Sequence, residues 1–436
     1  MASATSVLVA FTATNFRSFR DEATLNFTRP TKDFQPDFNH EDVAPAIAVF
    51  GSNASGKSNL LRALDTMFSL IGNSATRGSR SLPYSPFVLR EGELLPTSFT
   101  ATVRFDGIRY DYAFSYNAES IIEETLYSFP KNRARLLFAR EQVSGEERWT
   151  FGDSMTGPSQ LLARATRGHA LLLSTAALVN HDFLTPLQER FSNLVRFVDS
   201  GNMQHLLQDT LETLTQDEVL TRNVTRLLQH ADLGVASLNI ENAPATSEAY
   251  TQWRRVWEAL YPDSPVEEIN ERIRLATLQP QLLHARGDEN PIAMPFEWES
   301  LGTRNFLALL GPVLQRLRTG GVLIVDELDT SLHPRLVTEV VRLFQTPETN
   351  PRQAQLIITT HDVTVMMNTG EYSALNRDQI WFVEKDDEGA SELRDLGRYK
   401  VRKDEVFSRS YLNGRYGAIP RVDSHTFLDL WNESEQ

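Results

Sequence analysis

The sequence predicts an α/β protein with a mixed sheet around a phosphate-binding loop, an antiparallel β-subdomain and an α-helical insertion. The loop lies between an apolar strand and a helical stretch, over residues 46–65. This strand–loop–helix order is the context that such a motif requires. Two runs within 97–115 alternate apolar and polar residues around an Asp-Gly turn, as in an antiparallel hairpin. From about 160 to 231, leucines at three- and four-residue spacing predict helices instead.

The remaining elements extend this arrangement on both sides. The apolar runs of the second half are too uniformly hydrophobic for an edge strand and fit a buried sheet. The strand-like runs are 6–13, 23–27, 121–127 and 136–141 in the first half, and 320–326, 355–360 and 378–384 in the second. We therefore expect an N-terminal lobe with the loop and the antiparallel sheet over 1–160, a helical insertion or lid over 161–285, a C-terminal lobe over 286–422 and a polar tail over 423–436.

Composition fits a folded protein with a sizeable core and excludes several classes. The chain has 436 residues, a hydrophobic content of 41%, a formal net charge of −14 and no cysteine. Without cysteine there is neither a disulfide framework nor a thiolate metal site. The negative charge argues against a surface that coats nucleic acid indiscriminately. Because the N-terminal segment lacks the basic region of a signal peptide and no run approaches the length of a membrane span, we expect a cytoplasmic protein without a membrane-spanning segment.

Residues Gly51 to Ser58 read Gly-Ser-Asn-Ala-Ser-Gly-Lys-Ser, a complete phosphate-binding motif. The glycines let the backbone curl so that several N–H groups face one phosphate chain, and the helix N-terminus adds its positive dipole end. Lys57 is placed to reach the β- and γ-phosphates, and the Ser58 hydroxyl is suited to ligate Mg²⁺. A simple glycine turn is the alternative, which the flanking strand and helix disfavour. The expected nucleotide ligands are Gly51, Asn53, Ser55, Gly56, Lys57, Ser58 and Asn59.

Two carboxylates and a histidine follow the apolar strands of the second half. Asp326 and Glu327 end the run from residue 322, where a metal-binding aspartate and a water-activating glutamate are needed. His361 follows the next apolar strand, at the end where ligands collect in open α/β sheets. There it can hydrogen-bond the γ-phosphate or orient the attacking water. Each feature alone has an ordinary alternative, a solvated acidic turn or an incidental histidine, but their order behind a phosphate loop favours a nucleotide site.

A second candidate anion-binding element precedes the carboxylate strand. Ser300 and Gly302 stand at the start of a predicted helix over 304–317, and the N-terminus of a helix offers free backbone N–H groups. An ordinary helix cap is the alternative. That alternative does not explain why another phosphate-binding element lies directly ahead of the carboxylates.

Taken in order, these elements resemble the ATP-binding-cassette ATPases of the SMC/RecF class. The segment 300–303 is similar to the signature motif of that class, and 329–334 is similar to its D-loop. The chain resembles still more closely the RloA-like and OLD-like ATPases of bacterial phage defence, over most of residues 10–170 and 280–422. The segments that carry this resemblance are Asn15–Phe19, Gly51–Asn59, Glu299–Thr303, Asp326–Pro334, Thr360–Asp362 and Tyr411–Pro420.

The resemblance implies that two protomers enclose two ATP molecules in a homodimer or a higher even oligomer. Each signature segment would complete the nucleotide site of the other subunit. Lys57 and Ser58 would hold phosphate and Mg²⁺, and Asp326 would complete the metal shell. Glu327 would be the general base and His361 the switch histidine. The residues that would contact the γ-phosphate in trans are Ser300, Gly302 and Thr303.

Two positions depart from the pattern of this class. Ala54 stands where a glycine is common, and it carries a strain cost if the position needs a positive φ. The glutamine that usually completes the Mg²⁺ site is expected between about Ser81 and Thr97, where the sequence has none. Glu91, Glu93 or water would have to take its place.

The first functional hypothesis is a phage-defence ATPase that senses infection, through a phage-encoded trigger protein, and controls a separate toxic effector. Some relatives carry a TOPRIM nuclease on the same chain, which needs clustered acidic metal ligands after the ATPase. Only residues 421–436 follow the last resembling segment here. We therefore expect a TOPRIM-like or nuclease-like effector that is a separate protein.

The second hypothesis is a DNA-maintenance ATPase of the RecF type, which clamps duplex DNA when ATP drives dimerisation. Residues 394–421 include eight basic and three acidic residues, an excess of five positive charges. Such a patch suits phosphate tracking, docking of an acidic partner or a solvated face. The basic residues of this patch are Arg394, Arg398, Lys400, Arg402, Lys403, Arg409, Arg415 and Arg421.

Two other classes of nucleotide-binding protein are disfavoured. The 15–19 segment and the divergent signature argue against a transporter ATPase, and the lack of an Asn-Lys-x-Asp motif argues against a GTPase.

Overall fold

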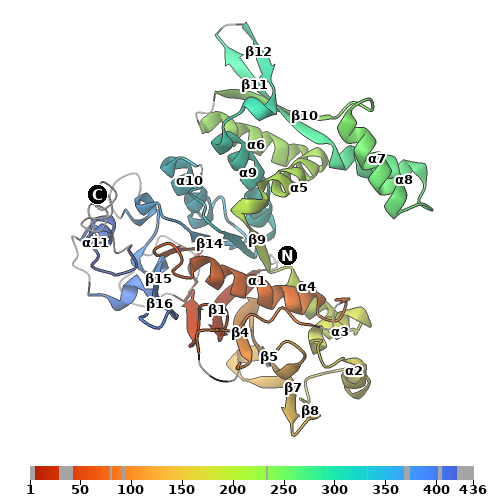
Figure 1. Cartoon of the computed structure of the whole chain (residues 1–436), viewed down its shortest axis with the longest axis vertical. Helices are drawn as coiled ribbons and strands as arrows, with labels where there is room; N and C mark the ends of the chain where they lie inside the picture. The colour runs from red at the N-terminus through yellow and green to blue at the C-terminus, as the bar shows by residue number, and fades with distance from the viewer. Residues whose placement is uncertain are drawn as a thin grey trace, which may run out of the picture.

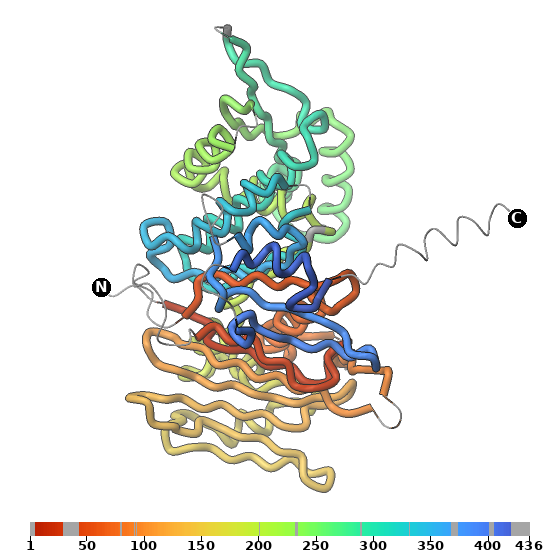
Figure 2. Tube along the Cα trace, turned by 90° about the vertical axis from the view of Figure 1, so that its left-hand side faces the viewer, coloured from red at the N-terminus to blue at the C-terminus, as the bar shows by residue number. Residues whose placement is uncertain are grey.

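Three sheets follow one another along the long axis of the molecule (Figure 1). A seven-stranded antiparallel sheet forms one end, a six-stranded sheet lies in the middle, and a three-stranded sheet belongs to an arm at the other end. Figure 2 shows the same order from the side, with the antiparallel strands stacked below the central lobe. The computed structural model describes residues 5–28, 43–78, 81–90, 92, 94–231, 234–287, 289–330, 332–367, 374–400 and 405–419.

The central sheet carries the phosphate-binding loop. Its strands are β3 (Ala46–Phe50), β9 (Val195–Val198), β13 (Val322–Val325), β14 (Gln355–Thr359), β15 (Ile380–Lys385) and β16 (Ser391–Asp395). They lie in the order β16-β15-β3-β14-β13-β9, and all the described pairings are parallel except that of β16. β3, β13 and β14 are buried throughout, as their uniformly apolar sequences predict. Because parallel strands end at one edge, the loop, the carboxylates and the histidine gather there.

The antiparallel sheet has the order β2-β1-β4-β5-β6-β7-β8. Its strands are β1 (Ser6–Thr14), β2 (Ala23–Asn26), β4 (Thr97–Phe105), β5 (Ile108–Tyr116), β6 (Ile121–Phe129), β7 (Arg135–Val143) and β8 (Glu146–Phe151). The predicted hairpin is confirmed as β4 and β5, which meet at Asp106 and Gly107. β6 and β7 extend the sheet as expected. Alternate residues of β4 are buried, which is the pattern of a sheet with one covered face.

Helices between the antiparallel and central sheets close the first hydrophobic core. They are α1 (Lys57–Asn73), α2 (Ser159–Ala165), α3 (Leu172–Leu178) and α4 (Leu184–Ser192). α1 packs against α3, α4 and β1, and its apolar residues join one cluster with the aromatic residues of the antiparallel sheet. The helix that begins at the phosphate loop is therefore anchored along its whole length.

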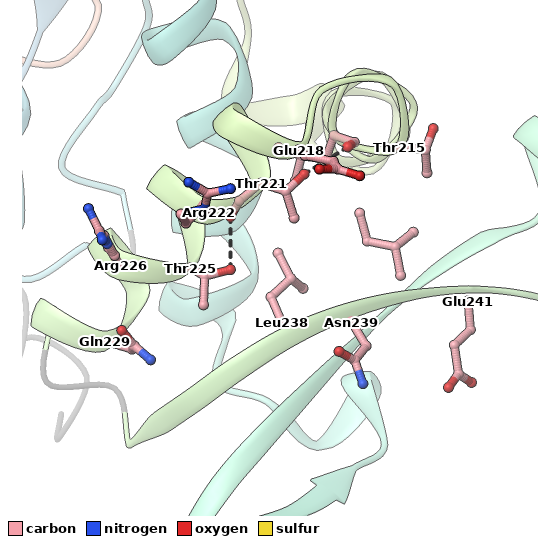
Figure 3. A pocket seen from close by; sticks show the side chains of 12 residues that line it. Thr215, Glu218, Thr221, Arg222, Thr225, Arg226, Gln229, Leu238, Asn239 and Glu241 are labelled. Carbon is pink, nitrogen blue, oxygen red and sulfur yellow. Dashed lines mark hydrogen bonds between the residues drawn. The ribbon is translucent and has the colours of Figure 1, made fainter.

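The arm rises from the central sheet and returns to it through one long helix. Its elements are α5 (Met203–Gln216), α6 (Glu218–His230), β10 (Val235–Asn242), α7 (Glu248–Leu260), α8 (Val266–Ala276), β11 (Leu278–Arg286), β12 (Glu289–Met294) and the returning helix α9 (Leu301–Thr319). α5 packs closely on α9 because Gly311 leaves room for Thr210: a Cβ at residue 311 would overlap the Thr210 side chain. Thr210 also donates to the Ala308 carbonyl over 2.7 Å. An open groove runs between α6 and β10 (Figure 3).

A second hydrophobic core joins the arm to the other face of the central sheet. It combines α9 and arm residues with α10 (Pro334–Gln345) and α11 (Phe407–Leu412). The described chain contains no helix with the length and apolar character needed to span a bilayer.

The expected helical insertion over 161–285 differs from the arrangement observed. α2, α3 and α4 belong to the core beneath the antiparallel sheet, and β9 is an edge strand of the central sheet. The arm extends from α5 to the returning helix α9, and its strands β10, β11 and β12 form a separate sheet. Leucine spacing marks helices but does not show which core each helix joins, because that depends on tertiary packing.

Candidate nucleotide-binding site

The phosphate loop wraps the N-terminus of α1 and is held by the 15–20 loop and by the start of β16. Gly56 has a φ of 115°, and a Cβ there would crowd the Ser18 and Ser391 hydroxyls. Ser391 donates to the Ser55 carbonyl over 2.6 Å. The Ser55 hydroxyl is buried and has no partner within the described residues, so a donor or acceptor remains available inside the loop. The loop is thus held in a shape that suits a phosphate.

Lys57 is buried beneath this loop with its ammonium directed back over the turn. The Nζ donates to the carbonyls of Gly51 over 2.9 Å and Ser52 over 3.2 Å. It also lies 3.1 Å from Nε2 of His361. Burial lowers the pKa of Lys57, an effect that the nearby carboxylates oppose. The structure therefore brings the predicted lysine and the predicted histidine together.

The Ser58 hydroxyl and Asp326 meet at the head of α1. Ser58 Oγ donates to Asp326 Oδ1 over 3.1 Å, and Thr359 Oγ1 donates to the same oxygen over 2.6 Å. Hydroxyl and carboxylate oxygens are the ligands that Mg²⁺ prefers, and this ion is commonly held by one or two protein ligands plus phosphates. The donor set therefore fits Mg²⁺.

Glu327 follows Asp326 in an unusual backbone conformation. Its φ of 54° lies in the left-handed region, which is costly for residues with a Cβ. Its N–H donates to Thr359 Oγ1 over 2.7 Å, and Thr330 Oγ1 lies 3.4 Å from its carboxylate. The side chain is exposed at the edge where the parallel strands end.

His361 is fixed by the segment that follows the carboxylates. Its backbone N–H donates to Asp329 Oδ2 over 3.1 Å. Burial, and secondarily the charge of Lys57, lower the pKa of His361. The imidazole is therefore neutral at neutral pH and able to accept a proton or a hydrogen bond.

Ser300, Gly302 and Thr303 lie apart from these residues, at the start of α9 on the side of the arm (Figure 1). Ser300 Oγ accepts from the Thr303 N–H over 3.0 Å and lies 2.9 Å from its hydroxyl. No described contact joins this turn to the phosphate loop of the same chain. The ordinary helix cap, which was the alternative interpretation of this segment, is present, and within one chain the turn and the phosphate loop stay separate.

The chain matches the family described as "AAA domain, putative AbiEii toxin, Type IV TA system" over residues 46–368. The chain belongs to this family. No curated protein matches it. Among solved structures, it is similar to the SMC head domain from Thermotoga maritima, with 12% identity, a TM-score of 0.42 and coverage of 90% of this chain and 99% of that chain. An SmcHead bound to the C-winged helix domain of ScpA has 14% identity and a TM-score of 0.42, and the match covers 89% of this chain and 96% of that chain. The recombination mediator protein RecF (RecF-ATPrS) has 14% identity and a TM-score of 0.38, and the match covers 90% of this chain and 99% of that chain.

The site thus lies in the AAA domain, and three residues that contact it were not assigned from the sequence. Thr359 reaches the carboxylate because β14 lies beside β13. Ser391 reaches the loop from the first residue of β16, the edge strand beyond β15. Asp329 lies in the D-loop-like segment, which was identified without a role for its carboxylate. A polar residue at the end of an apolar strand was the available signal for Thr359.

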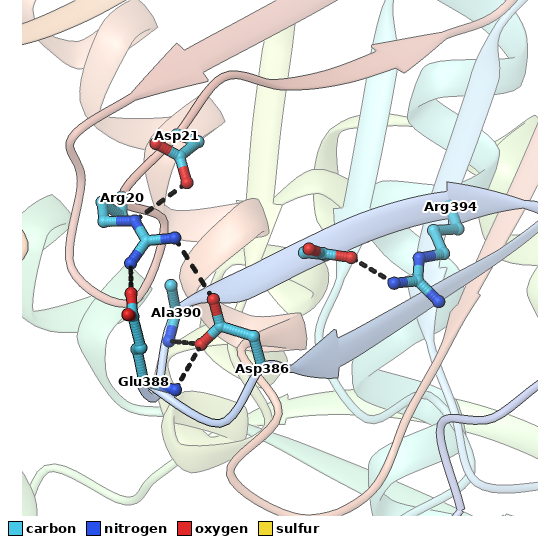
Figure 4. A network of polar contacts seen from close by, with 7 residues as sticks. Arg20, Asp21, Asp386, Glu388, Ala390 and Arg394 are labelled. Carbon is cyan, nitrogen blue, oxygen red and sulfur yellow. Dashed lines mark hydrogen bonds and ion pairs between the residues drawn. The ribbon is translucent and has the colours of Figure 1, made fainter.

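A cavity of about 620 Å³ adjoins the phosphate loop of this AAA domain and includes the expected ligand Asn59. Asn59 donates to Ser18 Oγ over 2.8 Å and accepts from Arg17 over 3.3 Å. The 15–20 loop that supplies Arg17 and Ser18 is tied to the β15–β16 turn by Arg20, which pairs with Asp386 and Glu388 (Figure 4). The segment 15–19, recognised in sequence only as part of a resemblance, therefore forms one wall beside the nucleotide loop.

The two departures noted in the sequence have different outcomes. Ala54 has a φ of 61°, so the predicted strain is present. Asn53 and Ala54 form the exposed tip of the loop. Glu91 and Glu93, the suggested replacements for the missing glutamine, lie outside the described residues.

Proposed function

We propose that this protein is an ATP-hydrolysing switch in anti-phage defence that controls a separately encoded, nuclease-like effector through ATP-dependent dimerisation. One observation carries the proposal: Lys57, Asp326 and His361 meet at one edge of the central sheet, whereas the capped turn at Ser300 lies apart on α9. A half-site of this kind is completed when a second subunit brings its own α9 turn to the nucleotide.

In this proposal each residue has a distinct task. Lys57 binds the β- and γ-phosphates, and Ser58 and Asp326 hold Mg²⁺, which supplies charge stabilisation for phosphoryl transfer. Glu327 takes a proton from the attacking water, and His361 orients that water or the γ-phosphate. The residues that complete the site in trans are Ser300, Gly302 and Thr303.

The family description supports a defence setting with a separate partner. Its wording refers to a toxin and a Type IV TA system, in which a toxic activity is held in check by another component. A cytoplasmic ATPase whose dimer forms or opens with nucleotide would provide that control. A phage-encoded protein would be the trigger.

Phage protection by cells that express this chain with its neighbouring genes tests the proposal. Lys57→Ala should abolish nucleotide binding, and Glu327→Gln should allow ATP binding but prevent hydrolysis. Both variants should lose regulated protection, and only Glu327→Gln should accumulate ATP-bound dimers in light scattering. Lys131→Ala and Glu119→Gln, at exposed positions, serve as controls. Unchanged protection in both site variants would contradict the defence role.

DNA clamping is the alternative, and the ion pairs of its patch weaken it. Arg394 pairs with Glu384 and Glu392, Arg398 with Asp395 and Arg415 with Glu405. Arg402, Lys403 and Arg421 lie outside the described residues. Because paired arginines release fewer counterions on binding phosphate, duplex binding should be weak and only shallowly salt-dependent. Tight duplex binding with ATP, measured by fluorescence anisotropy at about 150 mM salt, would instead favour the clamp.

A further inference from the structure

An open groove of the arm lies between a helix and the free edge of a strand. It has a volume of about 820 Å³ and is lined by α6 and β10 (Figure 3). Among the described strands, β10 pairs with β11 alone. An edge strand presents a row of backbone N–H and C=O groups to whatever lies beside it. Here that row faces a groove.

The register shows which backbone groups of β10 face α6. Ile240 lies opposite Pro280 on β11, and proline has no N–H to give to a paired strand. Ile240 therefore fits a non-hydrogen-bonded position, whose own N–H and C=O point away from β11. Gln229 on α6 donates to the Ala236 carbonyl over 2.5 Å, so that carbonyl also faces α6. The two observations place backbone groups of Ala236 and Ile240, on either side of the register shift at Val235/Ser237, away from β11.

Over Leu238 to Ile240, this edge has neither proline, charge nor bulge to prevent pairing. The eight residues of β10 read Val-Ala-Ser-Leu-Asn-Ile-Glu-Asn, without proline or lysine. The only irregularity in its pairing lies between Val235 and Ser237, before the groove-lining part. By contrast, β8 forms an edge of the antiparallel sheet and begins with the charged residues Glu146, Glu147 and Arg148. Charged, bulged or covered edges are the normal means of avoiding strand addition.

The charges along the groove are polarised. Arg222 and Arg226 lie one turn apart on the exposed face of α6 and have no carboxylate partner among the described residues. Glu218 lies one turn before Arg222 on α6, whereas Glu241 lies on β10; Figure 3 shows Arg226 and Glu241 on opposite sides of the view. An occupant with an acidic residue beside the arginines is therefore favoured over a basic one.

We propose that this groove binds an extended peptide segment of a partner protein, which adds to β10 as a fourth strand. The segment places an acidic side chain beside Arg222 and Arg226. A helix alongside a free strand edge is the arrangement in which sheet-adding recognition domains bind extended peptides, with the main chain giving affinity and side chains giving specificity. The binding event does not depend on the nucleotide site. Only the identification of the partner as the controlled effector rests on the proposed function.

A randomised eight-residue peptide library selected against the full-length protein tests the proposal. Enriched peptides should carry β-branched residues with Asp or Glu among them. Each would be resynthesised with a fluorophore and titrated by anisotropy. Ile240→Pro removes one outward N–H at a position where an edge strand tolerates proline. It should weaken peptide binding about tenfold or more, because one backbone hydrogen bond to the peptide is lost and the proline ring obstructs the added strand.

The double variant Arg222→Glu with Arg226→Glu keeps the backbone intact, and it should weaken acidic peptides about tenfold or more while sparing their amide analogues. Lys57→Ala should bind the peptides like the wild type, so failure of the nucleotide function and of the groove remain distinguishable. The proposal is overturned if no peptide is enriched, or if enriched peptides bind both groove variants as tightly as the wild type. It is also overturned if Ile240→Pro abolishes self-association in light scattering, because a second copy would then occupy the edge.

Discussion

Two residues that flank the expected phosphate position share a strained backbone. Ala54 at the loop tip and Glu327 after β13 have φ values of 61° and 54°. The left-handed region costs a residue with a Cβ about 1–2 kcal/mol. Such strain persists where the surroundings over-determine the conformation, and it is common at functional sites. The contacts of Gly56 and Thr359 described above supply that constraint.

Replacing Ala54 with glycine should raise the free energy of unfolding by about 0.5–1 kcal/mol, because relief of the left-handed strain exceeds the added entropy of the unfolded chain. Urea denaturation measures the change. Ala139→Gly, in β7 and without a positive φ, should lower stability by about 0.5–1 kcal/mol. Destabilisation by both substitutions would show that the loop tip is not strained.

The lowered pKa of His361 makes a directional prediction for pH. Because its pKa is lower when folded than when unfolded, the unfolded chain binds more protons in this window, so stability falls as pH drops below the ordinary histidine value of about 6.5. His361→Gln should lose less stability than the wild type between pH 7.5 and 5.5. His205→Gln, at an exposed position on α5, is the control. Parallel stability profiles for wild type and His361→Gln would exclude this coupling.

At the scale of elements, the start of α9 combines a structural cap with a proposed role in the partner's site. Ser300→Ala removes the bond to the Thr303 N–H and should cost about 1 kcal/mol of stability. Ser300→Asp restores a good cap but places a negative charge where the γ-phosphate is expected. We expect the alanine variant to lose both stability and hydrolysis, and the aspartate variant to lose hydrolysis alone. An aspartate variant with wild-type ATP turnover, measured by phosphate release, would leave Ser300 with the cap only.

Elements were predictable where a local pattern extends over many residues. The loop, the β4–β5 hairpin and the strands β13 and β14 follow from spacing and apolar runs alone. β9 has only four residues, too few to show a period, and its place beside β13 depends on a parallel pairing that sequence does not specify. Thr359 was missed for the same reason, because its contact with Asp326 exists only through the register of β13 and β14.

At the scale of the molecule, the arm ends in a helical hairpin that contributes little to either core. None of the residues of α7 is buried, and it packs mainly on α8. Trp253, Trp257 and Tyr261 stack along it, and Arg272 lies over the last two rings. Trp253 and Tyr261 remain partly exposed. Exposed aromatic residues of this kind mark contact surfaces, so we expect the hairpin to contact a second subunit.

Removal of the hairpin tests this role without opening the core. Ala243 donates to the Thr277 carbonyl over 3.0 Å, and Asn242 pairs with Leu278, so the two ends already lie side by side. An Asn-Gly turn in place of residues 244–276 should therefore join β10 to β11 as a hairpin. The loss of buried Ile269 and Ile273 should lower stability moderately, while ATP binding by the isolated chain should persist because the phosphate loop lies in another core.

ATP-dependent assembly of the deletion variant, measured by light scattering, should be weakened or lost. Assembly equal to that of the wild type would show that the hairpin is not a subunit contact. Peptide binding in the β10 groove should survive the deletion, because α6 and β10 both remain, and this separates the two surfaces of the arm.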